Sequence, residues 1–187
     1  KVQDTHMDDE TKALKVILPS LIKSEKVQQR FKLEARIAQK LAHQNIVNTY
    51  DLGEHDGIRF ITMEYLEGES LAEKLKREGT LSLDETLDII RPLLEALSFA
   101  HKTTVHRDIK PQNIFICKNG RIKMLDFGLA RVIGSQRFQQ SSAAVGTAVY
   151  MAPEHVNAKE AKEATPQSDL YSIGVVLYEC LIGELPL

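Results

Sequence analysis

The hydrophobic periodicity of the chain changes near Glu64, and this change restricts the fold more than any other feature of the sequence. Before it, short apolar runs typical of strands surround one amphipathic helical segment. After it, the long apolar periods are helical, and only two short strands are expected among them. Strands at one end and helices at the other predict an α+β fold, with a small β-rich lobe and a larger α-helical lobe. The cleft between two such lobes is a common place for a ligand.

Local signals set the boundaries of the expected elements. Asp56-Gly57 predicts a hairpin turn between two strands. Ser82 and Glu85 have the spacing of a capping box and mark the start of a helix. The expected strands span 11–18, 46–52, 58–63, 114–117 and 121–125, and the expected helices span 24–42, 82–101 and 168–181. The apolar face expected for the helix after Ser82 consists of Leu83, Leu87, Ile90, Leu94 and Leu97.

Composition excludes several classes of protein. The chain has 187 residues, enough to bury a substantial core, and a net charge of −2, so no overall basic field attracts nucleic acid. The most apolar stretch, 170–182, contains Glu179 and is shorter than the roughly 20 apolar residues that span a bilayer. We therefore expect no membrane segment in this stretch. Cys117 and Cys180 are too few for a disulfide framework or a zinc site and fit a reducing compartment. This favours a cytoplasmic location, or the cytosolic side of a membrane protein anchored outside this chain.

One polar segment, 106–113, carries a carboxylate, a lysine and an amide within six residues, at Asp108, Lys110 and Asn113. Phosphoryl transfer needs this combination: a group that accepts the hydroxyl proton, a cation for the moving phosphoryl group, and a metal ligand. Asp126 follows Asn113 by thirteen residues and closes a strand. Its carboxylate is a hard oxygen ligand of the kind that Mg²⁺ prefers.

Three segments, HRDIKPQN, LDFGLAR and GTAVYMAPE, occur in this order and together resemble the signature set of protein kinases. The residues of these segments are most similar to those of the bacterial Hanks-type serine/threonine kinases, and the resemblance covers essentially the whole chain. It implies a bilobal protein-kinase-like fold with an N-lobe and hinge at 1–66 and a C-lobe at 67–187. It also implies ATP and Mg²⁺ as the ligands of the cleft.

The resemblance assigns roles to individual residues. Asp108 is implied as the catalytic base and Lys110 as a contact of the γ-phosphate. Lys15 is implied to hold the α- and β-phosphates, with Glu34 as its ion-pair partner. The implied magnesium ligands are Asn113 and Asp126. The residues implied to surround adenine are Ala13 and Phe115 on its two faces, Met63 as gatekeeper, the Glu64 carbonyl and the Leu66 backbone.

Further implied roles are structural. Asp169 matches the aspartate that anchors the backbone of the catalytic loop. His106 and Phe127 are expected to stack in the regulatory spine. The other two spine positions, Ala38 and Thr49, are small, so this spine is expected to be weakly packed.

Two features indicate the substrate class. A lysine two residues after Asp108, here Lys110, is the serine/threonine pattern, and the hydroxyl of Thr147 is expected to reach both side chains. Small-molecule kinases of related fold generally lack the GT…APE segment, which favours protein substrates. A dimer for trans-autophosphorylation is a further expectation.

Arg107 and Arg131 are expected to form a cationic pocket for a phosphorylated residue, because a phosphate adds about two negative charges and strong acceptors. Ser141 and Ser142 lie at a suitable distance before Thr147. The hypothesis of activation by phosphorylation would fail if alanine at both serines left activity unchanged.

Two alternatives to an active kinase remain: an ATP-binding pseudokinase, and a fragment with only an interaction role. Intact Lys15, Asp108, Asn113 and Asp126 count against a pseudokinase. The fourteen residues before Lys15 contain no glycine, so the glycine-rich phosphate loop is expected upstream of this stretch. The final helices, with the arginine partner of Glu154, are expected downstream. We therefore expect the 187 residues alone to be marginally stable and weak or inactive as a kinase.

Overall fold

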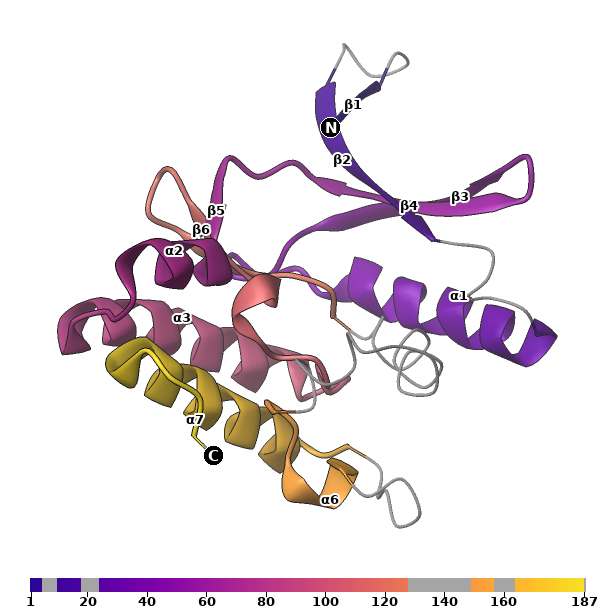
Figure 1. The fold of residues 1–187 in the computed structure, drawn as a ribbon. Helices are drawn as coiled ribbons and strands as arrows, with labels where there is room; N and C mark the ends of the chain where they lie inside the picture. Colours follow the sequence, from indigo (N-terminus) through magenta and orange to yellow (C-terminus); the bar gives the residue numbers. More distant parts are fainter. Residues whose placement is uncertain (5–9, 18–23, 128–148, 157–163, 187) are drawn as a thin grey trace.

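The computed structural model describes residues 1–4, 10–17, 24–127, 149–156 and 164–186. The chain forms two parts: a sheet with one helix beside it, and a larger part built mainly from helices (Figure 1). The expected α+β architecture with a small β-rich lobe and a helical lobe is confirmed. Among the described residues, no helix is long and apolar enough to cross a lipid bilayer.

The smaller lobe is an antiparallel sheet with the strand order β1-β2-β4-β3. Its strands are β1 (Val2–Asp4), β2 (Glu10–Ile17), β3 (Thr49–His55) and β4 (Ile58–Glu64). Helix α1 (Glu25–Lys40) packs against the sheet, and a small core of Ile17, Phe31, Ala35 and Ile61 joins the two. Asp56 and Gly57 both have positive φ, 49° and 74°, as a type I′ hairpin turn requires, so the predicted hairpin is confirmed.

Strand β3 begins three residues later than the sequence predicted. The segment 45–48 instead bonds to the other lobe, where the Val47 amide donates to the Met124 carbonyl at 3.0 Å and the Met124 amide donates to the Asn45 carbonyl at 2.8 Å. Residues 46–48 were expected to belong to the strand of the small sheet. The backbone groups of Asn45 and Val47 bind the helical lobe instead, and β3 begins at Thr49.

The larger lobe contains a three-stranded ribbon and a stack of helices. The strands are β5 (Gly68–Ser70), β6 (Ile114–Cys117) and β7 (Ile122–Met124), in the order β5-β6-β7. The helices are α2 (Leu71–Glu78), α3 (Leu83–Ala100), the single 3₁₀ turn η2 (Pro111–Asn113), α6 (Pro153–Val156) and α7 (Pro166–Ile182). Helices α3 and α7 lie side by side and supply much of the core (Figure 1).

Helix α2 was not predicted, although Ser70 and Glu73 form a capping box like that of Ser82 and Glu85. Both boxes are complete, because the serine oxygen accepts from the N3 amide and the glutamate accepts from the serine amide. Eight residues with only two buried leucines gave too weak a periodicity to identify α2 from the pattern.

The apolar face of α3 is rotated from the predicted one. Leu83 and Leu94 were expected to be buried but are 59% and 40% exposed. The buried face consists of Thr86, Ile89, Ile90, Leu93, Ala96, Leu97 and Ala100. The two alanines on it let α7 and the ribbon approach closely, and tertiary packing therefore selected this stripe over the one richest in leucine.

Leu93 and Leu94 provide a test of this rotation. Leu93→Ala should lower the free energy of unfolding by about 2–5 kcal/mol, because the side chain is fully buried in the core cluster. Leu94→Ala should change it by no more than about 0.5–1 kcal/mol, because that side chain already contacts water. Urea unfolding followed by circular dichroism measures both, and similar losses for the two variants would contradict the observed packing.

Candidate active site

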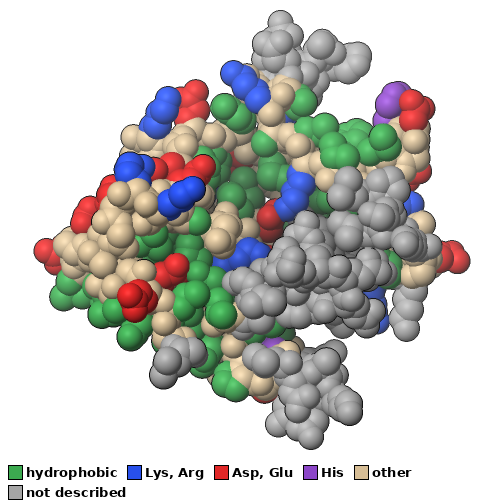
Figure 2. All heavy atoms as spheres, viewed as in Figure 1, with side chains coloured by type: hydrophobic (Ala, Val, Ile, Leu, Met, Phe, Trp, Pro, Cys, Tyr) green, Lys and Arg blue, Asp and Glu red, His purple; other side chains and the backbone are tan. Residues whose placement is uncertain are grey.

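The residues singled out from the sequence meet where the two lobes face each other. The Lys15 ammonium on β2 pairs with the Asp126 carboxylate, which lies just after β7, so this ion pair bridges the lobes. Their side chains are 34% and 24% exposed, so both remain accessible to a ligand. Figure 2 shows acidic and basic side chains meeting in a hollow at the centre of this face.

The segment before β6 holds three of the predicted residues together. The Lys110 ammonium lies 2.9 Å from Oδ2 of Asp108. The Asn113 amide donates to the Asp108 carbonyl at 2.7 Å and to its Oδ2 at 2.9 Å. Because the nitrogen of Asn113 is used in this way, its side-chain oxygen is the atom left to ligate a metal. A carboxylate, a cation and an amide oxygen are thus fixed by one short turn, η2.

A single buried carboxylate fixes the backbone of this segment. Asp169, 1% exposed on α7, accepts from the His106 and Arg107 amides at 2.8 Å each. It also lies 2.9 Å from Nε2 of His101 at the end of α3. The expectation that Asp169 anchors this loop agrees with these contacts. The contribution of His101 was missed, since nothing in its sequence context indicates a partner 68 residues away.

His106 is fully buried and connects the loop to the strand that precedes Asp126. Its Nδ1 accepts from the Asp108 amide at 3.2 Å, so the ring is the Nε2–H tautomer and donates to the Leu125 carbonyl at 2.8 Å. The ring packs edge-on against Phe127, with centroids 4.5 Å apart. The expected contact between these two spine residues is therefore present, and His106 has a packing role.

Glu34 has a different partner from the expected one. Its carboxylate is buried on α1 and lies 3.4 Å from the Arg107 guanidinium. Lys15, the predicted partner, pairs with Asp126 instead. The expected pair of Lys15 with Glu34 is therefore absent from this conformation, since each charge has a nearer opposite charge across the cleft. In this arrangement Arg107 connects α1 to the loop that holds Asp108.

Backbone strain is concentrated at the same place. Arg107 and Asp126 have φ of 72° and 62°, in the left-handed region that non-glycine residues rarely adopt. Strain of this kind costs on the order of 1–3 kcal/mol per residue and persists where surrounding contacts impose it. Asp169 imposes it at Arg107 through the amide contact. The two strained residues flank the cleft and aim functional side chains into it.

The residues expected around adenine come from both lobes. Ala13 on β2 is directly opposite Met63 on β4, so their side chains lie on the same face of the sheet. Glu64 ends β4, and Leu66 follows in the link to β5. Phe115 lies on β6 in the other lobe and is partly buried. This placement agrees with a flat ligand inserted between the lobes.

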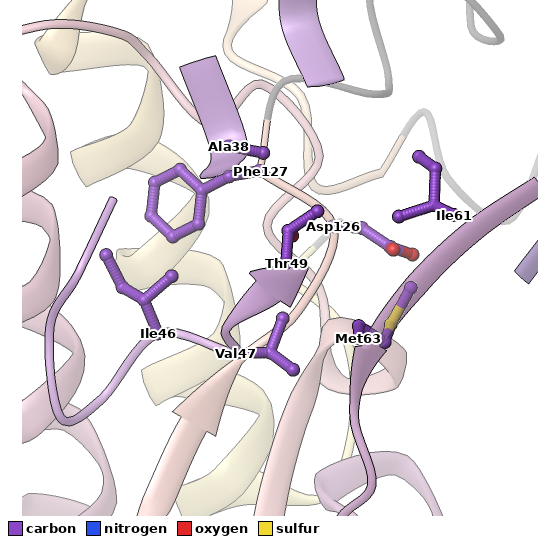
Figure 3. Close-up of a pocket in the computed structure, with 8 residues that line it drawn as sticks. All are labelled: Ala38, Ile46, Val47, Thr49, Ile61, Met63, Asp126 and Phe127. Atoms are coloured by element: carbon purple, nitrogen blue, oxygen red, sulfur yellow. The ribbon is translucent and has the colours of Figure 1, made fainter. Parts of the chain in front are cut away.

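A separate pocket lies on the inner side of Met63 (Figure 3). Its empty volume is about 350 Å³, a value that includes adjoining open solvent. Its lining consists of Ala38, Ile46, Val47, Thr49, Ile61, Met63, Asp126 and Phe127. Three expected spine residues, Ala38, Thr49 and Phe127, are among them, and weak packing of the spine stays a prediction.

The oxygen ligands present suit Mg²⁺. Among the described residues, no group of three or more His, Cys, Asp or Glu side chains could hold a metal by itself. Asp126 and Asn113 offer two hard oxygen atoms at one place. Mg²⁺ commonly binds through one or two such protein ligands together with substrate phosphates, so the residues fit a metal that arrives with a nucleotide.

Neither cysteine is an activated nucleophile. Burial raises the pKa of the Cys180 thiol to about 12, and burial also raises the pKa of Cys117 on β6. The thiolate is the reactive form, so both remain protonated at neutral pH. Thiol chemistry is therefore not what this site performs.

Several predicted residues fall outside the described ranges. They are Thr147, Arg131 of the expected cationic pocket, and the candidate phosphorylation sites Ser141 and Ser142. Glu154 is described, and Ser168 donates to it at 3.2 Å. One residue that the sequence reasoning missed is Lys123, a buried lysine on β7 that contacts Glu64. A lysine in a short strand is usually exposed, and nothing in the neighbouring sequence indicates that Lys123 is buried or paired with Glu64.

A family model described as the protein kinase domain matches residues 2–187. The chain belongs to the protein kinase domain family. Solved kinases also share its fold: the structure of the Mycobacterium tuberculosis PknI kinase domain superposes with a TM-score of 0.75 at 28% sequence identity. That match covers 94% of this chain and 65% of the PknI chain.

Bacterial protein kinases are also similar in sequence. The chain is 40% identical over 180 residues to the probable serine/threonine-protein kinase pknA2 of Bifidobacterium longum, covering 94% of this chain and 23% of that protein. It is 39% identical over 185 residues to the serine/threonine-protein kinase PrkC of Bacillus subtilis, covering 98% of this chain and 28% of that protein. The chain thus spans about a quarter of the length of these kinases.

Asp169→Asn tests the anchoring of the kinase loop. The amide nitrogen of asparagine cannot accept from the His106 and Arg107 amides, so one buried donor loses its partner. We expect the free energy of unfolding to fall by about 1–3 kcal/mol. Chemical denaturation measures this loss. Asp88→Asn, at an exposed position of α3, is the control and should be neutral. Equal stability of the two variants would contradict the anchoring role.

Proposed function

We propose that this chain carries the catalytic core of a serine/threonine protein kinase, which transfers the γ-phosphoryl group of ATP to serine or threonine hydroxyls of proteins. The observation that carries the proposal is the contact of Asp108 with Lys110 at 2.9 Å, with Asn113 on the same turn and Asp126 at the same cleft. Relatives named serine/threonine-protein kinases over nearly the whole chain support it.

The loop residues suit an in-line transfer. Asp108 accepts the proton of the substrate hydroxyl while the hydroxyl oxygen bonds to the γ-phosphorus. At the same time, the bond from that phosphorus to the β–γ bridging oxygen breaks and ADP leaves. Lys110, beside Asp108, offsets negative charge on the transferred group. Lys15 is placed to hold the α- and β-phosphates, and in doing so it exchanges its contact with Asp126 for one with the nucleotide.

Asn113 and Asp126 would hold Mg²⁺, which when bound neutralises charge on the β- and γ-phosphates. Lys15 occupies the Asp126 carboxylate in this conformation. In this proposal Glu34 would receive Lys15 once Arg107 releases its carboxylate.

The substrate class and setting follow from the same proposal. Lys110 and Thr147 favour serine and threonine over tyrosine, and the GT…APE segment favours protein substrates. Leu66 is the proposed boundary between an N-lobe and hinge at 1–66 and a C-lobe at 67–187. A cytoplasmic location and dimerisation for trans-autophosphorylation complete the proposal.

An ATP-binding pseudokinase is the second candidate. The pairing of Lys15 with Asp126 and of Glu34 with Arg107 favours it, because these four side chains neutralise one another without a nucleotide. A pseudokinase would be stabilised by Mg-ATP without transferring phosphate. The two candidates therefore differ in a single measurement.

Asp108→Asn should lower the rate of phosphate transfer from labelled ATP to a protein substrate by on the order of 10²–10⁴-fold, since the general base is lost. The assay uses the full-length protein with saturating Mg²⁺. Asp88→Asn is the matched control, because its carboxylate is exposed on α3 away from the cleft. Equal transfer by the Asp108 variant and the wild type would refute the enzymatic proposal.

Asp126→Asn should raise the Mg²⁺ concentration needed for half-maximal stabilisation by ATP at least tenfold, since even the outer-shell partners of a metal contribute roughly 10–100-fold to its affinity. Thermal unfolding at fixed ATP and varied Mg²⁺ measures this without any need for turnover. Asp51→Asn, on the exposed side of β3, should behave as the wild type does. An unchanged Mg²⁺ requirement for the Asp126 variant would exclude it as a metal ligand.

A further inference from the structure

Lys123 is a buried charge that the proposed chemistry does not use. It lies in the middle of β7 and is 5% exposed. A lysine this deep is uncommon and is tolerated only where its ammonium is paired and hydrogen-bonded. Both conditions hold: the ammonium lies 2.8 Å from Oε2 of Glu64 and donates to the Ile46 carbonyl at 3.2 Å.

These contacts join three separate segments of the chain. Glu64 is the last residue of β4 in the smaller lobe, Ile46 belongs to the link between α1 and β3, and Lys123 belongs to the larger lobe. Glu64 is also bound to the link at both its backbone and its side chain. Its amide donates to the Asn48 carbonyl at 2.9 Å, and its carboxylate accepts from the Asn48 amide at 3.2 Å.

The link itself is held by β7. The Asn45 side-chain amide donates to the Ile122 carbonyl at 2.8 Å, and Ile46 forms a parallel bridge with Met124. The link is therefore bound to the larger lobe, although α1 and β3 on either side of it belong to the smaller one. Lys123 extends this attachment from the link to the end of β4.

This junction adjoins the proposed nucleotide site. Lys123 is directly opposite Phe115 on β6, so the two side chains lie on the same face of the ribbon. Phe115 is the residue proposed to contact one face of adenine, and the Glu64 carbonyl is proposed to meet its edge. Lys123 thus lies on the same face of the ribbon as Phe115, and its ammonium binds the carboxylate of Glu64, the two residues that the proposed function places around the base.

We propose that Lys123 is a positioning residue that fixes the Glu64 backbone for adenine nucleotides through the buried contact with the Glu64 carboxylate. The inference rests on the proposed nucleotide-binding function and assigns part of its affinity to a residue outside the cleft. Without the lysine, the Glu64 side chain, already 25% exposed, turns to water. The end of β4 then loses its attachment to β7, and ordering it again on binding lowers affinity.

The effect should fall on binding rather than on chemistry. Asp108, Lys110 and Asn113 are held by Asp169 and η2, which Lys123 does not contact. Lys123→Met, which keeps the apolar stem and removes the charge, should raise the KM for ATP and the Kd for ADP about tenfold, the value expected when one charged hydrogen bond of about 1.5 kcal/mol is lost. The kcat should stay within about twofold of the wild-type value.

Lys118→Met is the matched control. Its ammonium lies 3.2 Å from the Glu67 carboxylate and also connects the β6–β7 turn to the segment after β4, but the two side chains are 74% and 62% exposed. An exposed pair of this kind contributes little to stability, so KM and Kd should not change.

Glu64→Gln should weaken ADP binding, as Lys123→Met does. The double variant should be no weaker than Lys123→Met alone, because both changes remove one interaction.

The test uses the full-length protein, with ADP binding by calorimetry, steady-state kinetics, and hydrogen exchange at the Glu64 amide. Faster exchange at that amide together with the KM increase in Lys123→Met, but not in Lys118→Met, supports the inference. An unchanged Kd and KM in a folded Lys123→Met protein, or additive losses of ADP affinity in the double variant, overturns the inference while the kinase proposal stands.

If Lys123→Met does not fold, Glu64→Gln decides by the same measurements. A wild-type protein that binds no ADP refutes the proposed function itself. In that case, unchanged hydrogen exchange at the Glu64 amide in Lys123→Met would separately refute the role of Lys123 in holding the end of β4.

Discussion

The Asp169 carboxylate is the interaction on which the rest of the site depends. A buried carboxylate is costly unless its oxygen atoms accept hydrogen bonds, and here the donors are the His106 and Arg107 amides and the His101 ring. Those amides can reach it only if Arg107 adopts a positive φ. The same backbone path directs Asp108 into the cleft and Arg107 toward α1. One charge on α7 thereby determines the geometry of a loop more than fifty residues earlier in the chain.

Among the described residues, several ion pairs join the lobes, and these pairs differ in how exposed they are. Lys15 with Asp126 and Glu34 with Arg107 lie at the cleft, where a nucleotide and a metal can compete for the same charges. Lys123 with Glu64 is more deeply buried and is supported by the hydrogen bonds of Asn45 and Asn48. The first two pairs are therefore the more accessible to a ligand. The third is the most firmly held of the three.

The pocket behind Met63 shows a consequence of small side chains at one layer of the core. Ala38, Thr49 and Phe127 all line it (Figure 3), and Phe127 in turn packs on His106. Where a core has a gap, the residues that line it make fewer dispersion contacts. Larger side chains at positions 38 and 49 would add such contacts beside Phe127.

Local chemistry in the sequence was sufficient for most elements and, through the three motifs, for the family. The Asp56-Gly57 turn and the Ser82 capping box depend on neighbouring residues, and both were predicted correctly. Long-range pairing was not predictable in the same way. Three contacts join residues at least 59 positions apart: Glu34 with Arg107, His101 with Asp169, and Lys123 with Glu64.

The sequence by itself determined the family and which residues are candidates for the site, because residue types and spacing within each motif encode the chemistry. Only the tertiary structure decided which charges pair, which stripe of α3 is buried and where β3 begins. The physical reason is that ion pairs and hydrogen bonds form with whichever opposite group the fold brings closest. Burial and distance are properties of the packed molecule, and no single stretch of sequence records them.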